Sequence, residues 1–238
     1  MHLPPAETVG AVVPAAGEGR RLPGATAKQF RRLAGAPMLW HTLRRLAGAG
    51  AIGRIVLVLP PSEIEGFALP GDLPVPVDVA AGGPRRQDSV SNGLAALPPQ
   101  IEWVAVHDGA RPLLPPALVA DCLAAARGSG AAIAALPASD TVKRADGEGF
   151  SQETLPRSGL WLAQTPQVAR RDLLARALEA AAARGLEGAD EAALLEAIGV
   201  RVKMVPGSRE NLKITSPDDL ALAEALLARA ASPAGGAP

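Results

Sequence analysis

Short apolar runs rich in valine, isoleucine and alanine alternate along the chain with segments of helical pattern. Six of these runs predict strands, at residues 9–14, 54–60, 75–80, 102–108, 131–137 and 200–206. Most are apolar nearly throughout, which is typical of strands buried on both faces of a parallel sheet. The pattern therefore predicts an α/β three-layer sandwich, in which helices cover both faces of a mainly parallel sheet. In such folds, ligands bind at the carboxyl ends of the strands.

One segment, residues 138–157, interrupts this alternation. It is polar, has little helical periodicity and carries Asp146-Gly147 in its middle, a dipeptide that strongly favours a hairpin turn. We expect a protruding β-arm of two strands. Because an isolated hairpin is only marginally stable in water, the arm should pack on another surface, and a second copy of the chain is the simplest candidate. A mobile surface loop is the alternative.

Turn and cap residues mark the ends of two predicted helices. Pro37 suits the first turn of one helix, and Gly48 or Gly50 suits its left-handed end. Near the end of the chain, Ser216 is a candidate N-cap, followed by Pro217 and two aspartates that favour a helix N-terminus. We expect a closing helix there.

Composition and charge narrow the class of protein. The 238 residues are 48% hydrophobic, enough for one large domain, expected at 1–230 with a disordered tail at 231–238. Lysine and arginine number 24, as do aspartate and glutamate, so we expect no nucleic-acid partner. No apolar run reaches the length of a membrane span and the N-terminus lacks a signal-peptide pattern, so we expect no membrane partner. The single cysteine, Cys122, is expected to be a buried small hydrophobe in a cytoplasmic protein.

The first predicted strand leads into a loop of small residues and cations. The strand ends at Pro14, and the small residues after it would let backbone N–H groups approach a ligand closely, at Ala15, Ala16, Gly17 and Gly19. Arg21 and Lys28 add positive charge, a combination that suits a triphosphate. The loop lacks the Rossmann fingerprint, because Leu22 fills the third glycine position, and it lacks the P-loop ending. A glycine turn with solvated arginines is the alternative.

Asp108 stands at the carboxyl end of the strand predicted at residues 102–108, with Arg111 three residues later. A carboxylate in this place could hold Mg²⁺, which usually binds through one or two carboxylates and substrate phosphates. The alternative is an aspartate that caps the following turn. His107 has no second histidine or cysteine at metal-ligand spacing, so we expect a partly buried, hydrogen-bonded imidazole instead of a metal ligand.

Two further polar clusters, residues 82–94 and 208–215, begin with glycine or serine residues typical of turns, and both carry cations. Gly83 and Ser89 could supply backbone and hydroxyl hydrogen bonds to a nucleobase. Lys213 could neutralise a phosphate. Each cluster alone would be explained equally well by charges on a solvated surface.

In this order, the clusters resemble one known family. The motifs are "PAAGEGRR", "GGPRRQDSV", "VHDGARP" and "ENLKIT", accompanied by "SDTVKR", "LPRSGLWLAQTPQ" and "GADEAAL". Over about residues 8 to 228, they resemble the bacterial and plastid 2-C-methyl-D-erythritol 4-phosphate cytidylyltransferases of the non-mevalonate isoprenoid pathway. The resemblance implies a Rossmann-like nucleotidyltransferase fold whose β-arm interlocks in a homodimer.

The resemblance also implies a role for each matching residue. The catalytic residues would be Arg21, Lys28 and Lys213. The nucleotide would lie against Pro14, Ala15, Ala16, Gly17, Gly19, Gly83, Ser89 and Asp108. Asp108 would also meet either Mg²⁺ or another divalent cation, or the sugar-phosphate end. The sugar phosphate would be held by Gly109, Arg111 and Thr165 together with Lys213 of one subunit, and by Thr141 and Arg157 from the arm of the other.

The implied reaction joins CTP to methylerythritol phosphate. A phosphate oxygen of the sugar attacks the α-phosphorus of CTP, which releases pyrophosphate and leaves 4-diphosphocytidyl-2-C-methyl-D-erythritol. Because the nucleophile is already an anion, neither a covalent intermediate nor a general base is needed. The alternatives are transfer to another polyol phosphate, such as ribitol 5-phosphate, and a non-catalytic module that senses nucleotides.

Four positions depart from the family's usual pattern. They are Ala27 in place of proline, Pro84 in place of an acidic residue, Gly109 in place of alanine, and Glu210 in place of aspartate. Pro84 puts a side-chain contact to the nucleotide in doubt, and Glu210 puts in doubt the reach of a carboxylate near the second substrate.

Overall fold

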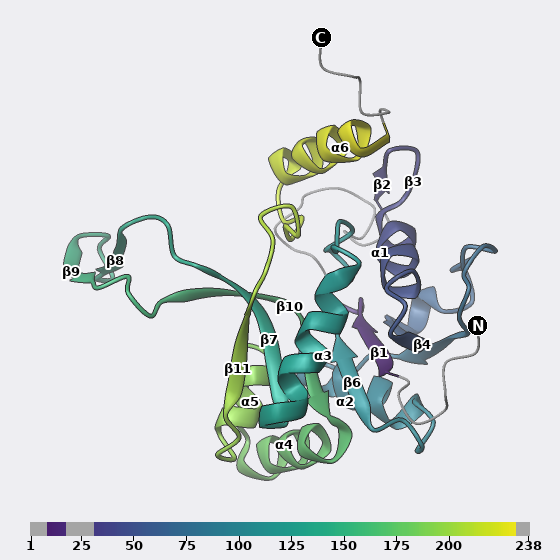
Figure 1. The fold of residues 1–238 in the computed structure, drawn as a ribbon, viewed down its shortest axis with the longest axis horizontal. Helices are drawn as coiled ribbons and strands as arrows, with labels where there is room; N and C mark the ends of the chain where they lie inside the picture. Colours follow the sequence, from purple (N-terminus) through teal and green to yellow (C-terminus); the bar gives the residue numbers. More distant parts are fainter. Residues whose placement is uncertain (1–8, 18–30, 232–238) are drawn as a thin grey trace.

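A mostly parallel sheet forms the centre of the molecule (Figure 1). The computed structural model describes residues 9–17 and 31–231, and within these residues the sheet has seven strands. Their order across the sheet is β11 (Val202–Pro206), β7 (Ala131–Pro137), β10 (Trp161–Arg170), β6 (Trp103–Val106), β1 (Val9–Pro14), β4 (Ile52–Leu59) and β5 (Val77–Ala81). Only β10 runs antiparallel to its neighbours. All six predicted strands are confirmed.

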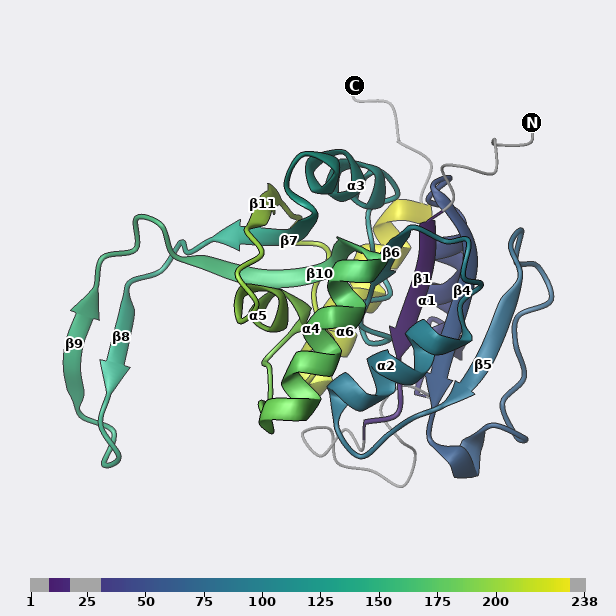
Figure 2. The ribbon, with the colours of Figure 1, turned by 90° about the horizontal axis from the view of Figure 1, so that it is seen from below.

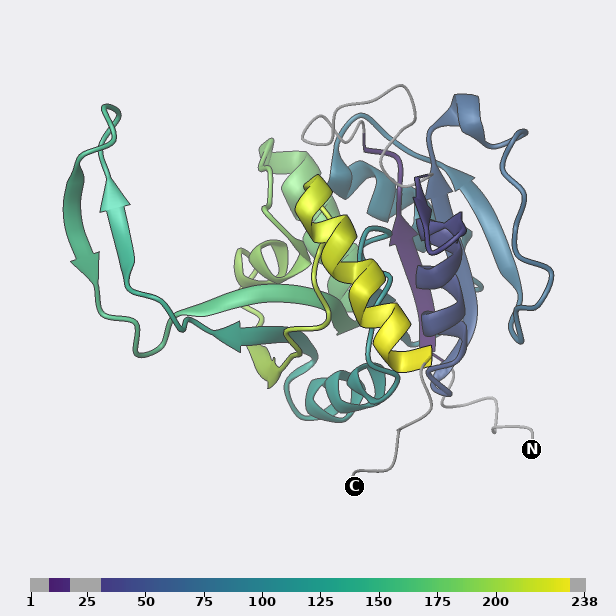
Figure 3. The same cartoon turned by 90° about the horizontal axis from the view of Figure 1, so that it is seen from above.

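Helices cover both faces of the sheet, as predicted. The faces are visible from opposite sides in Figures 2 and 3. One carries α1 (Met38–Ala47) and α3 (Ala117–Ser129), and the other carries α2 (Arg86–Ala96), α4 (Arg171–Arg184) and α5 (Glu191–Glu196). Successive side chains of β1 point to opposite faces of the sheet, so Val13 packs in the core with α1 and Val12 packs in the core with α2. The three-layer prediction is therefore confirmed.

The closing helix, α6 (Pro217–Ala231), lies over a small ribbon formed by β2 (Arg32–Leu33) and β3 (Ala36–Pro37) (Figure 3). It begins as predicted, since the Asp219 N–H donates to Ser216 Oγ and the Ser216 N–H donates back to Asp219 Oδ2. This reciprocal pair satisfies two donors at the helix start. Before α1, Pro37 occupies the cap position, and Gly50, with φ +73°, adopts the left-handed conformation that follows the helix.

The predicted β-arm is present. It consists of β8 (Val142–Ala145) and β9 (Ser151–Leu155), which pair antiparallel and extend away from the body of the molecule (Figure 1). Residues 146–150 form its turn, which is longer than a two-residue Asp-Gly turn. Within this turn, Asp146 Oδ1 accepts hydrogen bonds from the N–H groups of Glu148 and Phe150. The residue with positive φ is Gly149, at +90°. The aspartate therefore shapes the hairpin as an Asx turn, and its neighbouring glycine does not.

Strand β10 has no counterpart among the predicted strands. Its sequence mixes Gln164, Thr165 and Gln167 with a proline, which hides the apolar run that marks the other strands. Because β10 runs against β6, its first half reaches the edge of the sheet at which the parallel strands end. It thereby places three polar side chains, all nearly buried, beside the carboxyl end of β6.

Cys122 is buried in α3, as predicted, and burial raises the pKa of its thiol to about 12. A short 3-10 helix, Pro61–Glu63, follows β4. Among the described helices, none is both long and apolar enough to cross a lipid bilayer.

Candidate functional site

Asp108 lies directly beyond the carboxyl end of β6 and is the centre of an ion cluster. Lys213 Nζ is 2.8 Å from its Oδ2, and Arg111 Nε is 3.5 Å from the same oxygen. Arg86 Nη2 is 3.2 Å from Oδ1. Among the described residues, three cations from separate segments, one of them the first residue of α2, thus face one carboxylate whose side chain is 10% exposed. The sequence predicted that Asp108, Arg111 and Lys213 belong to one site, and the structure brings them together.

The cations keep Asp108 ionised. Burial alone would raise the pKa of its carboxyl, but Lys213, Arg86 and Arg111 together outweigh burial, so that pKa lies well below its usual range. A dominantly cationic surrounding with an ionised oxygen at its centre is suited to a ligand that brings its own negative charge, such as a phosphate.

Arg86 joins Asp108 to a second carboxylate. Arg86 is the first residue of α2, and its Nη1 and Nη2 lie 2.5 and 3.1 Å from the two carboxylate oxygens of Glu191 on α5. Burial alone would lower the pKa of Arg86, but Glu191 and Asp108 outweigh it and raise that pKa, so the guanidinium stays charged. In the sequence, Arg86 is only one of the cations of the polar cluster at residues 82–94, and Glu191 was not predicted to belong to the site.

His107 and Thr165 hold the backbone of Asp108 in place. The Asp108 N–H donates to Thr165 Oγ1, and that hydroxyl lies 3.0 Å from His107 Nδ1. His107 Nε2 lies 3.1 Å from the carbonyl oxygen of Arg111, which can only accept, so Nε2 carries the proton and Nδ1 accepts from the hydroxyl. Burial lowers the pKa of His107 to about 4. The expected hydrogen bonding of this histidine is confirmed, but the imidazole is fully buried and not partly buried as predicted.

Buried amides position the loop that carries Lys213. Asn211 Nδ2 donates to the carbonyl oxygen of Thr165, while the carbonyl of Asn211 accepts from Arg111 Nη1 at 2.7 Å. Gln164 Nε2 donates to the carbonyl of Ser208 at 2.9 Å. The first half of β10 therefore anchors the segment before Lys213 against the end of β6. Neither Gln164 nor Asn211 was predicted to belong to the site, although both lie in segments that carry the family resemblance.

Two loops of small residues meet beside this cluster. Ala15 and Ala16 follow β1, and a Cβ atom added to Gly82, after β5, would lie 2.2 Å from Ala16 Cβ. A Cβ atom on Gly83 would lie 2.5 Å from Asp88 Cβ, and the Gly83 N–H donates to Ser89 Oγ. Only glycine permits this close approach of the two loops. The predicted nucleotide-binding residues on both loops therefore lie together at the carboxyl ends of β1 and β5.

Some predicted site residues lie elsewhere. Gly19, Arg21 and Lys28 fall outside the described residues, as does Ala27 among the departures. Thr141 and Arg157 are exposed and flank the β-arm, where Arg157 Nη1 donates to the carbonyl of Ser139. Because the arm extends away from the sheet (Figure 2), these two do not line the ion cluster of their own chain. Pro14 is the last residue of β1, and Gly17 lies in the loop after it and is exposed.

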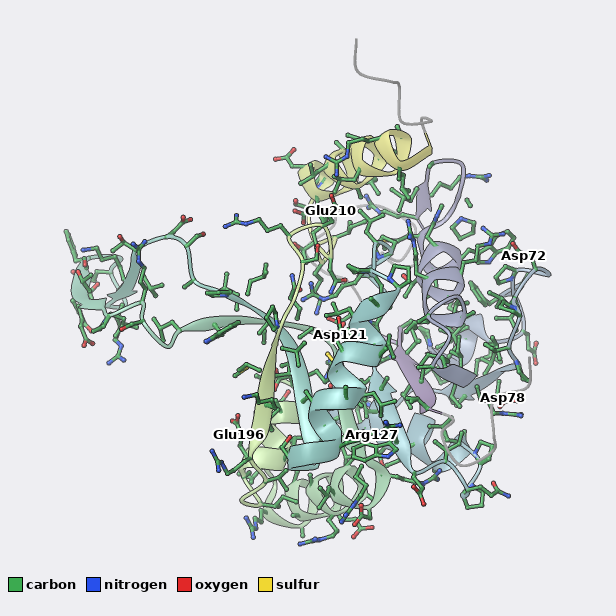
Figure 4. The ribbon with its side chains drawn as sticks, viewed as in Figure 1. Asp72, Asp78, Asp121, Arg127, Glu196 and Glu210 are labelled. Atoms are coloured by element: carbon green, nitrogen blue, oxygen red, sulfur yellow. The ribbon has the colours of Figure 1, made fainter. Side chains whose placement is uncertain are left out.

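The structure gives a local reason for two of the departures from the family pattern. A Cβ atom on Gly109 would lie 3.1 Å from Leu39 Cδ1 and 3.2 Å from Ala15 Cβ, so glycine relieves a tight contact. Glu210 forms an ion pair with Arg229 of α6 and so points to that helix (Figure 4). Nothing in the structure explains Pro84.

The described residues contain no group of three or more histidine, cysteine, aspartate or glutamate side chains that could hold a metal ion by themselves. Asp108 nevertheless offers an ionised carboxylate at the strand ends. That donor set fits Mg²⁺, which often binds to one protein carboxylate and completes its shell with phosphate oxygens and water. It does not fit zinc, which takes nitrogen and sulfur ligands in closed sites.

Comparison with known proteins gives one consistent result. Residues 9–229 match the family model described as 2-C-methyl-D-erythritol 4-phosphate cytidylyltransferase. The protein of that name from Syntrophus aciditrophicus is 44% identical over 92% of this chain and 95% of its own length. The one from Ralstonia nicotianae is 46% identical over 93% of this chain and 92% of its own. The crystal structure of the Thermus thermophilus protein superposes with a TM-score of 0.77 at 37% identity, covering 92% of this chain and 98% of that one.

Proposed function

This chain belongs to the 2-C-methyl-D-erythritol 4-phosphate cytidylyltransferase family, and on that premise we propose that the Asp108 ion cluster and the small-residue loops beside it form its active site. The enzyme transfers the cytidylyl group of CTP to 2-C-methyl-D-erythritol 4-phosphate in isoprenoid precursor biosynthesis. The observation that supports this site most strongly is the convergence of Lys213, Arg111 and Arg86 on one ionised carboxylate at the strand ends.

The chemistry requires placement and charge compensation more than proton transfer. The sugar phosphate is an anion at neutral pH, and the transition state spreads negative charge over phosphoryl oxygens. His107 is neutral and both of its ring nitrogens are hydrogen-bonded, so it serves as a scaffold. The loop around Ala16 carries only small side chains, so the nucleotide can approach its backbone closely, whereas the N–H groups of Gly82 and Gly83 already donate to the carbonyl oxygen of Leu59 and to Ser89 Oγ.

Lys213 is the described cation best placed to move onto a substrate. Its side chain is 38% exposed, and its partner Asp108 keeps two other cations. An exposed lysine exchanges one oxyanion for another at small cost, because it is a flexible point charge. We expect Lys213 to contact the phosphates during transfer, while Arg111, which is almost fully buried, stays fixed and orients the sugar phosphate. Arg21 and Lys28 are proposed to hold the triphosphate from the loop after β1.

Mg²⁺ belongs to the proposal as well, with Asp108 as its protein ligand. When bound, a divalent cation neutralises charge on the phosphate oxygens. Chelation with EDTA should therefore abolish turnover of CTP, and added Mg²⁺ should restore it. Full activity in the presence of excess chelator would contradict this part of the proposal.

Arg157 and Thr141 are proposed to act on the site of a partner subunit. Both are exposed and flank the β-arm, and the side chains of Phe150 and Leu162, 68% and 58% exposed, give the arm and its base apolar surface that a second copy of the chain could cover. A guanidinium from the partner's arm would clamp the phosphate of the second substrate in bidentate fashion. The homodimer would then be part of the active site.

Mixed dimers test this arrangement. A Lys213→Ala chain and an Arg157→Ala chain are each expected to be nearly inactive. A hybrid dimer has one site with both side chains intact, so random subunit exchange should restore about a quarter of wild-type activity. If no activity returns although exchange is demonstrated with tagged chains, the contribution of Arg157 in trans is refuted.

Pyrophosphate release tests the function itself. Release from CTP should be rapid with methylerythritol phosphate, slow with ribitol 5-phosphate and absent without an acceptor. Preference for ribitol 5-phosphate would make the chain a different polyol phosphate cytidylyltransferase, and nucleotide binding without release would make it a sensing module. Since both substrates are soluble metabolites, we propose that the enzyme works in the cytoplasm, which cell fractionation would test.

A further inference from the structure

Glu191 is a buried carboxylate at the start of α5 that contacts Arg86, one of the three cations around Asp108. Its side chain is 2% exposed and its two oxygens contact Arg86 Nη1 and Nη2 at 2.5 and 3.1 Å. Arg86 Nη2 in turn lies 3.2 Å from Asp108 Oδ1. The guanidinium therefore links the start of α2 to both carboxylates, and its Nη2 contacts both Asp108 and Glu191.

The position of Glu191 is itself fixed by β10. Gln167 Nε2 donates to Asp190 Oδ2 at 2.9 Å, and Gln167 Oε1 accepts from the N–H of Ala192 at 2.8 Å. Asp190 also caps α5, because its Oδ1 accepts from the N–H of Ala193. Gln167 stands two residues after Thr165, which holds the backbone of Asp108. One strand thus sets both the backbone of Asp108 and the helix that presents Glu191.

We propose that Glu191 is a positioning residue of the transfer reaction, which holds the Arg86 guanidinium in the one orientation that fixes Asp108 Oδ1. The proposal rests on the proposed function, in which Asp108 faces the substrates. Arginine presents its donors in a rigid planar fork, so a carboxylate that takes one edge of the fork decides where the other donors point. Asp108 would then keep its orientation while Lys213 leaves its Oδ2 for a phosphate.

A purely structural salt bridge explains the arrangement less well. Buried ion pairs add little net stability, because desolvation offsets most of their attraction. Glu191 and Arg86 also lie at the first turns of two helices beside the strand ends, where a structural pair of apolar residues would pack α2 against α5 equally well. Without Glu191, both Nη groups of Arg86 would be free to turn onto Asp108 and compete with Lys213 and with Mg²⁺ for its oxygens.

The expected effect is on turnover. Partners that orient a ligand from behind typically contribute a factor of about 10 to 100 in activity. Glu191→Gln keeps the volume and one acceptor but removes the charge and the paired contact. We expect kcat to fall by about 10- to 100-fold, with the KM for CTP changed much less, because the interaction matters most when charge develops in the transition state.

A double-mutant cycle with Arg86→Met tests whether Glu191 acts through Arg86 or independently of it. If Glu191 acts through Arg86, Glu191→Gln should lower kcat by less than about 3-fold in the Arg86→Met background. Glu196→Gln is the matched control, since Glu196 is an exposed carboxylate on the same helix (Figure 4), and this variant should equal wild type. Circular dichroism and thermal unfolding of each variant give the folded fraction.

Three outcomes would overturn the proposal. The first is a wild-type kcat in Glu191→Gln, and the second is a loss of activity in that variant no larger than its loss of folded protein. The third is a double variant, Arg86→Met with Glu191→Gln, in which kcat falls by the product of the two single effects. If Glu191→Gln does not fold, the apolar pair Arg86→Met with Glu191→Leu replaces it, because such pairs often preserve stability. That variant should fold with its kcat lowered by about 10- to 100-fold, and a wild-type kcat would refute the proposal. Failure of the wild-type enzyme to transfer a cytidylyl group would instead refute the proposed function.

Discussion

Replacing Asp108 with asparagine removes the carboxylate on which Lys213, Arg111 and Arg86 converge. The three cations are not equally affected. Lys213 is 38% exposed and can be hydrated, and Arg86 retains Glu191. Arg111, with a side chain that is 9% exposed, loses its ion-pair partner, and its Nε has no hydrogen-bond partner among the described residues. The cost of Asp108→Asn should therefore come mainly from Arg111.

The magnitude follows from the geometry of that pair. Unit charges 3.5 Å apart attract by about 5 kcal/mol at an effective dielectric constant of about 20. Removing one partner of a buried pair commonly costs about 3 to 5 kcal/mol. Because Asn211 still accepts from Arg111 Nη1, we expect the lower end, about 3 kcal/mol, or a fall in Tm of about 6 to 12 °C for a chain of this size. We expect kcat/KM to fall by about 100- to 1000-fold.

The assay pairs urea unfolding with pyrophosphate release, and Asp78→Asn is the matched control. Asp78 pairs with Arg54 at the partly exposed edge of the sheet (Figure 4). The same substitution there should cost less than about 1 kcal/mol and leave activity unchanged. If Asp108→Asn were as stable as wild type, Arg111 would not depend on the carboxylate. If it kept wild-type turnover, Asp108 would not belong to the active site.

Three further predictions concern the scaffold around this carboxylate. His107 has a pKa of about 4 in the folded protein against 6.5 when unfolded, so between these pH values the unfolded chain binds one more proton than the folded chain. The wild-type protein should therefore lose about 3 kcal/mol of stability as the pH falls from 6.5 to 4. His107→Asn should lose less stability over the same range, which urea unfolding of both proteins at each pH would measure. Gly82→Ala should raise the KM for CTP by about 10-fold or more, because its new Cβ would lie 2.2 Å from Ala16 Cβ, whereas Gly71→Ala, which meets open space, should be neutral in steady-state kinetics. Lys213→Met should lower kcat by about 100-fold or more while the protein unfolds at nearly the wild-type temperature; an undiminished kcat would remove this lysine from the phosphate site.

Much of the fold could be predicted from the sequence, because its strongest signals are local. The parallel strands are apolar runs such as residues 131–137, which the structure reproduces as β7 without a shift. The closing helix carries its own cap at Ser216. Strand β10 was not predicted because its buried residues include two polar amides and a threonine beside Val168 and Ala169. The burial of these polar side chains is made favourable only by partners distant in the sequence, such as Asn211.

The candidate site divides in the same way. Asp108, Arg111 and Lys213 follow predicted strands or lie in marked loops, so their convergence could be inferred from the rule that parallel strands end at one edge. Arg86 and Glu191 could not be inferred, because their pairing joins the first turns of two helices that are 105 residues apart in the sequence. A buried glutamate next to a capping aspartate is a signal only once the partner is known.

A crystal structure with methylerythritol phosphate and a non-hydrolysable CTP analogue tests the proposed site most directly. The convergence of charges predicts that Lys213 Nζ leaves Asp108 and lies within about 3 Å of a phosphate oxygen, with the base against the loops of Ala16 and Gly83. Phosphates bound elsewhere, with Lys213 still paired to Asp108, would contradict it.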